Sequence, residues 1–301
     1  MGLSTPRGDA GPTPQPSRVR VATVAPGVEP WRSETLRLFR SLRALGGTLA
    51  DAPGICYFDR TVDRRIAHQL LDLGVTVRLI APVDPRCAMG NNLVMLEADE
   101  EADWIVACDC DVVVTGDFSD ELRGDAVAAV PVDNGLAPIA DWPRLYEAFG
   151  VPVPTERYRA NADGAPIPPY FNAGVLVVPA PLVAPLRASW ERWLHAVSDA
   201  FDAQQVPAPF ATRRAFTDQL ALALALAEGT VAHRVLPPGM NAPSHMVMHR
   251  GLQPDAIDPR IVHYHHNVGP DGRILPSVHA GVNRAIDRVN TALSAAASDA
   301  A

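Results

Sequence analysis

Two aspartates, Asp109 and Asp111, follow an apolar run from Trp104 to Cys108. The run predicts a strand buried on both faces, and the spacing of two residues places both carboxylates on one side of the chain. Two carboxylates at close range repel each other unless a cation lies between them. Hard oxygen ligands at the end of a sheet strand suit Mg²⁺ or Mn²⁺ carrying a diphosphate. The pattern favours a divalent metal site, with a solvated acidic turn as the alternative.

Further polar side chains stand at the ends of later predicted elements: Asn172, Asp218, Gln219, His263, His265 and His266. Asn172 opens a strand expected over 168–179, and the histidines end a strand expected over 261–264. Asp218 and Gln219 lie in the first turn of a helix expected over 216–227, where an acid also interacts favourably with the helix dipole. Asp218 is therefore either a site residue or a helix-end charge, and the histidines are either ligands or the end of a surface strand.

The elements that must position these residues alternate between strand and helix over the first 115 residues, beginning with a strand over 19–25. This alternation predicts a parallel sheet of doubly wound type. Ser33 is the expected N-cap of the first helix, and a further helix is expected over 91–98. In such sheets ligands bind beyond the carboxyl ends of the strands, which is where Asp109 and Asp111 fall.

The two ends of the chain differ from its centre. Residues 1–17 are rich in Pro, Gly, Ser and Thr and predict a disordered tail. An apolar stripe running from Val278 to Leu293 predicts a last helix, packed on the core or on a second subunit of a homo-oligomer.

Composition excludes several mechanisms. The chain has 301 residues and a formal net charge of −8, and all 26 of its basic residues are arginine. Without lysine, a Walker P-loop, a pyridoxal Schiff base and a kinase-type phosphate lysine are excluded. The negative charge argues against nucleic acid or an anionic membrane as the main partner. None of the four cysteines forms a C-x-x-C pair, and no apolar run reaches membrane-spanning length, so we expect a cytoplasmic protein.

Five segments occur in an order that resembles glycosyltransferase family 8, the retaining nucleotide-sugar transferases that include glycogenin and bacterial galactosyltransferases. They are Asp109-x-Asp111, Phe171-Asn-Ala-Gly-Val175, Asp218-Gln219, Leu236-Pro-x-x-x-Asn241 and Ile261-Val-His263-Tyr. The resemblance covers residues 18 to 267 and implies a GT-A fold, a Rossmann-like doubly wound mixed sheet with helices on both faces. A single GT-A domain is thus expected over 18–275, followed by a C-terminal helix and tail over 276–301.

The resemblance also implies an activity, the metal-dependent transfer of a hexose from a nucleotide-sugar to an unidentified acceptor. The expected donor is a UDP-hexose. In the family two acids and a histidine hold Mn²⁺, or Mg²⁺ in its place. This points to Asp109, Asp111 and His263, with His265 as the alternative ligand. Asp218 and Gln219 fall at the catalytic positions that face the sugar. The expected donor-binding residues are Thr23, Ala25, Cys110, Asn172, Ala173, Gly174 and Arg273.

Two other functions stay open on the sequence. Asp109-Cys-Asp111-Val-Val also matches the nucleophile motif of haloacid-dehalogenase phosphatases, although that class expects a later lysine and an earlier nucleophile strand. A protein that binds a sugar-nucleotide without turning it over would keep the same residues. No motif in the sequence identifies the acceptor, which we expect to be a small molecule.

Overall fold

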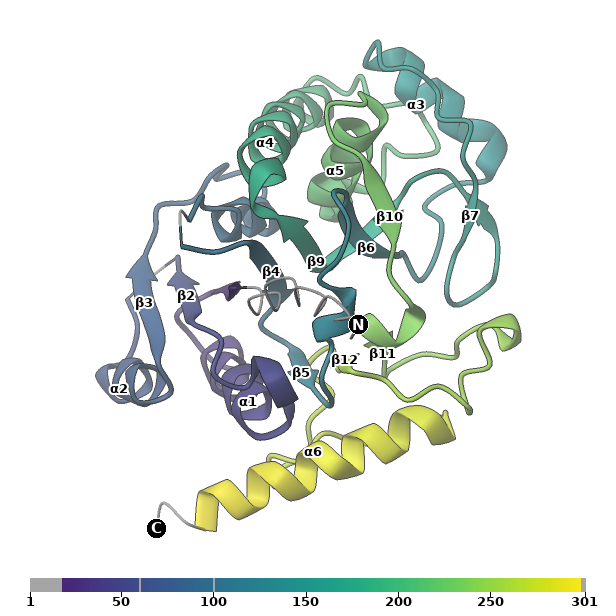
Figure 1. Cartoon of the computed structure of the whole chain (residues 1–301). Coiled ribbons are helices and arrows are strands. Elements are labelled where there is room, and N and C mark those ends of the chain that lie inside the picture. Colours follow the sequence, from purple (N-terminus) through teal and green to yellow (C-terminus); the bar gives the residue numbers. More distant parts are fainter. Residues whose placement is uncertain (1–17, 60, 100, 299–301) are drawn as a thin grey trace, which may run out of the picture.

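The computed structural model describes residues 18–298 except 60 and 100, so the tail expected over 1–17 lies outside the described residues. The centre of the described chain is a seven-stranded sheet in the order β10-β6-β9-β4-β1-β2-β3 (Figure 1). In that order the strands are β10 (His233–Val235), β6 (Val127–Pro131), β9 (Phe171–Pro179), β4 (Trp104–Asp109), β1 (Val19–Ala25), β2 (Gly54–Phe58) and β3 (Val75–Leu79).

One strand of this sheet runs against the others. β9 is antiparallel to both β4 and β6, whereas the remaining neighbours pair in parallel. The start of β9 therefore lies at the edge where the six other strands end. Asp109 at the end of β4 and Asn172 near the start of β9 meet at this edge, because Cys108 pairs with Val175. The mixed doubly wound sheet implied by the family resemblance is confirmed. The parallel pairing predicted from the alternation over the first 115 residues is confirmed as well, for β1, β2, β3 and β4.

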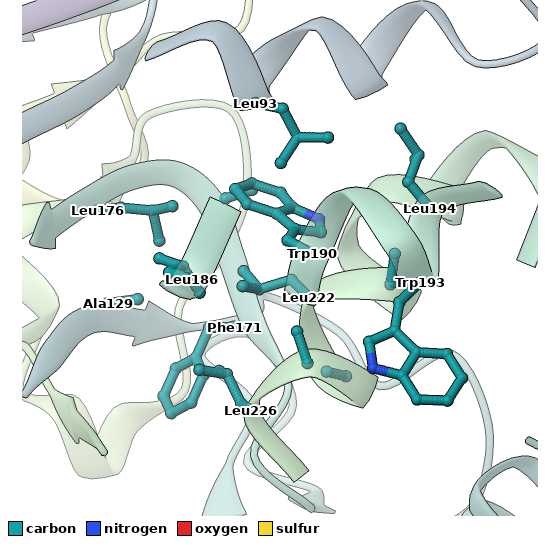
Figure 2. Packing of buried hydrophobic residues seen from close by; sticks show 14 of the residues in the cluster. Leu93, Ala129, Phe171, Leu176, Leu186, Trp190, Trp193, Leu194, Leu222 and Leu226 are labelled. Carbon is teal, nitrogen blue, oxygen red and sulfur yellow. The ribbon is translucent and has the colours of Figure 1, made fainter. Parts of the chain in front are cut away.

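Helices cover both faces of the sheet, as expected. α1 (Trp31–Leu45) and α2 (Arg64–Asp72) pack on one face, with Phe39 and Leu70 in one apolar cluster with the strands. α4 (Ala180–Asp202) and α5 (Thr217–Ala227) pack on the other. Figure 2 shows Leu186 and Trp190 of α4 grouped with Leu222 of α5, and Leu176 of β9 lies beside this group. α5 is apolar on nearly all sides because it is buried between α4 and the sheet.

A second, three-stranded sheet extends the site edge. It has the order β11 (Ala242–Pro243), β12 (Ile261–His263) and β5 (Val112–Val114), with β12 antiparallel to β5. The last helix, α6 (Ala280–Ser298), crosses beneath it and contacts both α1 and β12 (Figure 1). Its residues Val282, Ile286 and Val289 are buried in this chain's own core, whereas Val278, at the start of the predicted stripe, precedes the helix and is exposed.

The segment between β6 and β9 is largely irregular. It contains α3 (Trp142–Ala148) and a small hairpin of β7 (Tyr158–Arg159) and β8 (Pro166–Ile167). Short 3₁₀ turns complete the described chain: η1 (Gly47–Leu49), η2 (Ala88–Met95), η3 (Ser119–Glu121), η4 (Ile139–Asp141), η5 (Arg214–Phe216), η6 (Pro238–Met240) and η7 (Arg250–Leu252). Among the described residues, no helix combines the length and the apolar character needed to cross a membrane.

Two local predictions are wrong. The expected helix over 91–98 is the 3₁₀ segment η2, which starts earlier. Gly90 disfavours an α-helix there, and the side chain of Asn91 accepts a hydrogen bond from the backbone N–H of Val83 (3.0 Å). Ser33 is not an N-cap: α1 begins at Trp31, and the Ser33 hydroxyl donates to Glu29 (2.8 Å).

Candidate active site

Three side chains from two distant parts of the chain meet at the carboxyl edge of β4. Asp109 ends β4, and Asp111 directly precedes β5. The pairing of β12 with β5 sets His263 opposite Val112. The His263 Nε2 atom consequently lies 3.0 Å from Asp111 Oδ1 and 3.9 Å from Asp109 Oδ2. The two acids and the histidine predicted as metal ligands are thus brought together.

Neighbouring polar groups orient these three side chains. The His263 Nδ1–H donates to the Asn241 side-chain oxygen (3.1 Å), which fixes the ring and directs Nε2 towards the acids. The Asn92 amide donates to Asp109 Oδ1 (3.3 Å). On the opposite side, His266 bonds Glu34 of α1 through Nδ1 (2.7 Å), while its Nε2 lies 4.0 Å from Asp111. The acid pair therefore sits inside a shell of amide and imidazole groups.

His265 offers a second imidazole. It adopts a left-handed backbone (φ 46°), and its ring stacks on that of His263 at 3.7 Å. Its Nε2 atom is buried and has no hydrogen-bond partner among the described residues. The ligand atoms of Asp111, His263 and His265 all lie within 4.8 Å of one another. An orphaned imidazole nitrogen beside carboxylate oxygens fits a divalent cation such as Mn²⁺.

Burial and mutual attraction set the charges. Burial, reinforced by Asp111, raises the pKa of Asp109 to about 6. Burial opposes ionisation of Asp111 as well, but the attraction of His263 prevails and lowers its pKa below the ordinary value. Burial alone would lower the pKa of His263, yet Asp111 raises it to about 9. The imidazolium supplies the positive charge between the two acids, and a metal ion that replaced it would release this proton.

His265 behaves oppositely. Burial, with repulsion from His263 and His245, lowers the pKa of His265 to about 2. Its ring is neutral at physiological pH, which is the state that can ligate a metal.

Gly174 brings the backbone of β9 against this cluster. A Cβ atom there would lie 2.8 Å from His263 Cε1 and 2.9 Å from both Asp109 Oδ2 and Asn172 Oδ1. Only glycine permits so close an approach. Asn172 is held by the hydrogen bond that its Oδ1 accepts from the Gly174 N–H (2.7 Å).

A cavity of about 410 Å³ opens beside the cluster, and its lining includes Asp133, Asn172, Arg213, Gln219, His245 and His265. Gln219 and Asp218 come from the first turn of α5, which the Trp190 indole N–H holds by donating to the Asp218 carbonyl (2.8 Å). The Asp218 carboxyl is only 2% exposed, and its Oδ1 has no hydrogen-bond partner among the described residues. Burial, with repulsion from Asp109, raises the pKa of Asp218 to about 7.

Several predicted donor-binding residues lie elsewhere. Thr23 and Ala25 on β1 and Ala173 on β9 are buried in the core. Cys110 is buried between the two acids, and its Sγ lies 3.9 Å from Glu34 Oε2. Arg273 lines a different cavity, between α1, α2 and α6. The structure therefore gathers Asn172, Gly174, Asp218 and Gln219 around the acid pair, and not Thr23, Ala25, Ala173 and Arg273.

Sequence reasoning did not place Glu34 and Arg213 at the site. Asn92, Asp133 and His245 also belong to it, and no role of their own was predicted for them. Asn241 belongs to the motif Leu236-Pro-x-x-x-Asn241, but the motif did not predict its contact with His263. Glu34 carried one usable signal, since an acid on the apolar side of a helix next to Thr35 and Leu36 has to be paired when it is buried.

The fold is the GT-A fold of solved glycosyltransferases. The solved galactosyltransferase LgtC, in complex with donor and acceptor sugar analogues, superimposes with a TM-score of 0.56 at 12% identity over 92% of this chain and 95% of that one. The glycosyltransferase GlyE of Streptococcus pneumoniae TIGR4 gives 0.51 at 15% identity over 93% of this chain and 64% of that one. At such identity the similarity shows the fold alone. No curated protein sequence matches significantly.

The family is given by a sequence match. The Rhodobacterales glycosyltransferase domain matches residues 32–229, more than half of the chain, and the chain belongs to this family. The predicted relationship to GT-A glycosyltransferases is confirmed, and the family match favours it over the phosphatase alternative.

Proposed function

We propose that this glycosyltransferase moves a hexose from a nucleoside-diphosphate sugar, preferably a UDP-hexose, to an acceptor hydroxyl. In this proposal Asp109, Asp111 and His263 hold Mn²⁺ or Mg²⁺. The observation that carries the proposal is the convergence of these three side chains, with His263 Nε2 3.0 Å from Asp111, beside the cavity of about 410 Å³. The donor and acceptor analogues bound by LgtC are consistent with a sugar-nucleotide donor.

A bound divalent ion would neutralise the diphosphate that departs as the glycosidic bond breaks. The protein's own task at this point is to present the ligands. Asn241 keeps Nε2 of His263 directed at the acids, and Asn92 orients Asp109. The orphaned Nε2 of His265 makes that residue the second imidazole candidate.

The sugar is proposed to lie against β9 and the first turn of α5. Asn172 and Gln219 line the cavity and present amide groups suited to sugar hydroxyls. Asp218, when ionised, places a negative charge near the carbon on which positive charge develops. Retention of configuration follows from the resemblance to family 8. Asp133, half-buried at the same cavity with its pKa raised to about 6 by burial, is a further hydroxyl partner.

Ligand-induced stabilisation tests the proposal. UDP should raise the melting temperature of metal-free protein only when Mn²⁺ is added, because the metal bridges protein and diphosphate. Asp111→Asn and His263→Ala should abolish this rise, while His195→Ala, on α4, should keep it. Release of UDP from UDP-galactose or UDP-glucose then separates an enzyme from a binding protein. Stabilisation by UDP that is equal with and without Mn²⁺ would contradict the metal site.

A further inference from the structure

A second cavity lies apart from the active site, and we infer that it binds a ligand carrying one or more phosphate groups. It has a volume of about 460 Å³ and lies where α1, α2, α6 and the loop before α6 meet. Four arginines line it: Arg37 and Arg40 from α1, Arg65 from α2 and Arg273 from the loop. It shares no lining residue with the cavity beside Asp109.

The four arginines form no ion pair within 4 Å among the described residues, although Arg37 also interacts at longer range with the buried carboxylate of Glu34. Arg37 bonds only neutral oxygens, the Tyr264 hydroxyl (2.9 Å) and the Gly272 carbonyl (3.3 Å). The guanidinium groups of Arg40, Arg65 and Arg273 form no ion pair in the described chain. Elsewhere in this acidic protein arginines do pair with acids, as Arg86 does with Asp84 (2.8 Å). Four unpaired guanidinium groups in one concavity repel one another, and an anion would relieve this repulsion.

The one carboxylate in the cavity lining, Asp271, sets a single negative charge against the four arginines. Asp271 accepts a hydrogen bond from the backbone N–H of Arg273 (3.1 Å), which shapes the turn. Arg37 is held in place by its two hydrogen bonds and by the Tyr264 ring, 5.3 Å from its guanidinium carbon. Arg37 and Arg40 are half-buried, so less water screens them than the exposed Arg65 and Arg273.

Guanidinium groups arranged in this way match phosphate in particular, because each planar fork can donate two hydrogen bonds to phosphate oxygens. Four of them from three elements exceed what a single monoanion needs. The floor of the cavity includes the apolar side chains of Leu36, Ile66 and Leu293, which suit the organic part of a phosphate ester. The ligand class is thus a phosphorylated or pyrophosphorylated molecule, either free in solution or displayed as a lipid headgroup.

Titration calorimetry with pyrophosphate in metal-free buffer tests this site. Without a divalent ion the acid pair at Asp109 cannot hold the anion, so binding reports on the arginines. The double variant Arg40→Gln/Arg65→Gln should weaken pyrophosphate binding by at least about 10-fold for each arginine removed, since a charge-assisted hydrogen bond contributes that much. Its matched control is Arg144→Gln/Arg187→Gln, which removes the same charge from exposed positions on α3 and α4.

Wild-type protein that does not bind pyrophosphate would overturn the inference, and so would equal weakening in the two double variants. His263→Ala should leave this binding unchanged, so failure of the proposed catalytic function and failure of this site are distinguishable. Flotation with phosphatidylcholine vesicles, with and without phosphatidic acid, identifies the source. Binding to the acidic vesicles that is lost in Arg40→Gln/Arg65→Gln assigns the phosphate to a headgroup, and pyrophosphate binding without flotation assigns it to a soluble ester.

Discussion

Replacing Asp218 with asparagine should remove a loss of stability at high pH and should also disable the enzyme. The Asp218 carboxyl is buried, its Oδ1 has no partner in the described chain, and burial raises its pKa to about 7 from an ordinary value of 3.8. Between these two values the folded state binds more protons than the unfolded state. Wild-type stability contributed by this group therefore falls as the pH rises through that window, and Asp218→Asn removes the dependence.

The size of the effect follows from the two pKa values. A folded-state pKa of about 7 against 3.8 lowers the free energy of unfolding by roughly 4 kcal/mol at pH 8 and by less than about 2 kcal/mol at pH 5, where folded Asp218 is protonated. The buried amide of the variant carries its own cost, which does not change with pH. The difference in unfolding free energy between Asp218→Asn and wild type should thus widen in favour of the variant by roughly 2–3 kcal/mol from pH 5 to pH 8.

The assay is urea unfolding of metal-free protein at both pH values, followed by turnover with Mn²⁺. Asp84→Asn is the matched control, because the Arg86 guanidinium holds the pKa of Asp84 below its ordinary value, and that variant should lose stability at pH 8. In Asp218→Asn, kcat should fall roughly 10²-fold or more, with UDP affinity changed only a few-fold. A free-energy difference independent of pH would refute the buried-charge argument, and wild-type turnover would return Asp218 to a helix-end charge.

Two further outcomes are expected. Chelation should abolish turnover and Mn²⁺ should restore it better than Mg²⁺, because an imidazole ligand favours the softer ion; full activity in excess chelator would sink the metal site. Gly174→Ala should weaken Mn²⁺ binding, measured by calorimetry, about 10-fold or more, since its Cβ would lie 2.8 Å from His263 and 2.9 Å from Asp109. Gly116→Ala, whose Cβ would meet nothing closer than 3.9 Å, should bind Mn²⁺ normally, and equal behaviour of the two variants would show that Gly174 is not needed for the close approach.

Hydrophobic pattern and residue spacing predicted those parts of the fold that depend only on residues close together in the sequence. The apolar run before Asp109 gave β4, and the spacing of Asp109 and Asp111 gave the acid pair. The direction of β9 was not readable in the same way, because an apolar strand such as 171–179 has the same pattern whether it runs parallel or antiparallel to its neighbours. Its start at the site edge, with Asn172 and Gly174, came from the family resemblance.

Contacts that depend on how separate elements pack were the ones missed. Glu34 reaches the site because α1 turns that face towards His266, and Arg273 lies in the second cavity because the loop before α6 passes over Arg37. Neither orientation is encoded within a few residues of the side chain concerned. The histidines make contacts of both kinds. His263 and His265 stack because they are close in the sequence, whereas His263 contacts Asp111 only because β12 pairs with β5.

That pairing has a consequence for how the protein is made. Asp111 and His263 are 152 residues apart, so at ordinary translation rates the ribosome adds His263 roughly 8–30 s after Asp111. During this interval the nascent chain must carry two neighbouring acids without the imidazole that compensates them. The family match ends at residue 229, and a fragment cut there would stay in this state permanently, with the strand that supplies His263 removed. The contact of His263 with the two acids thus forms late in biosynthesis. Tight Mn²⁺ binding would mark a chain that has been synthesised at least through β12.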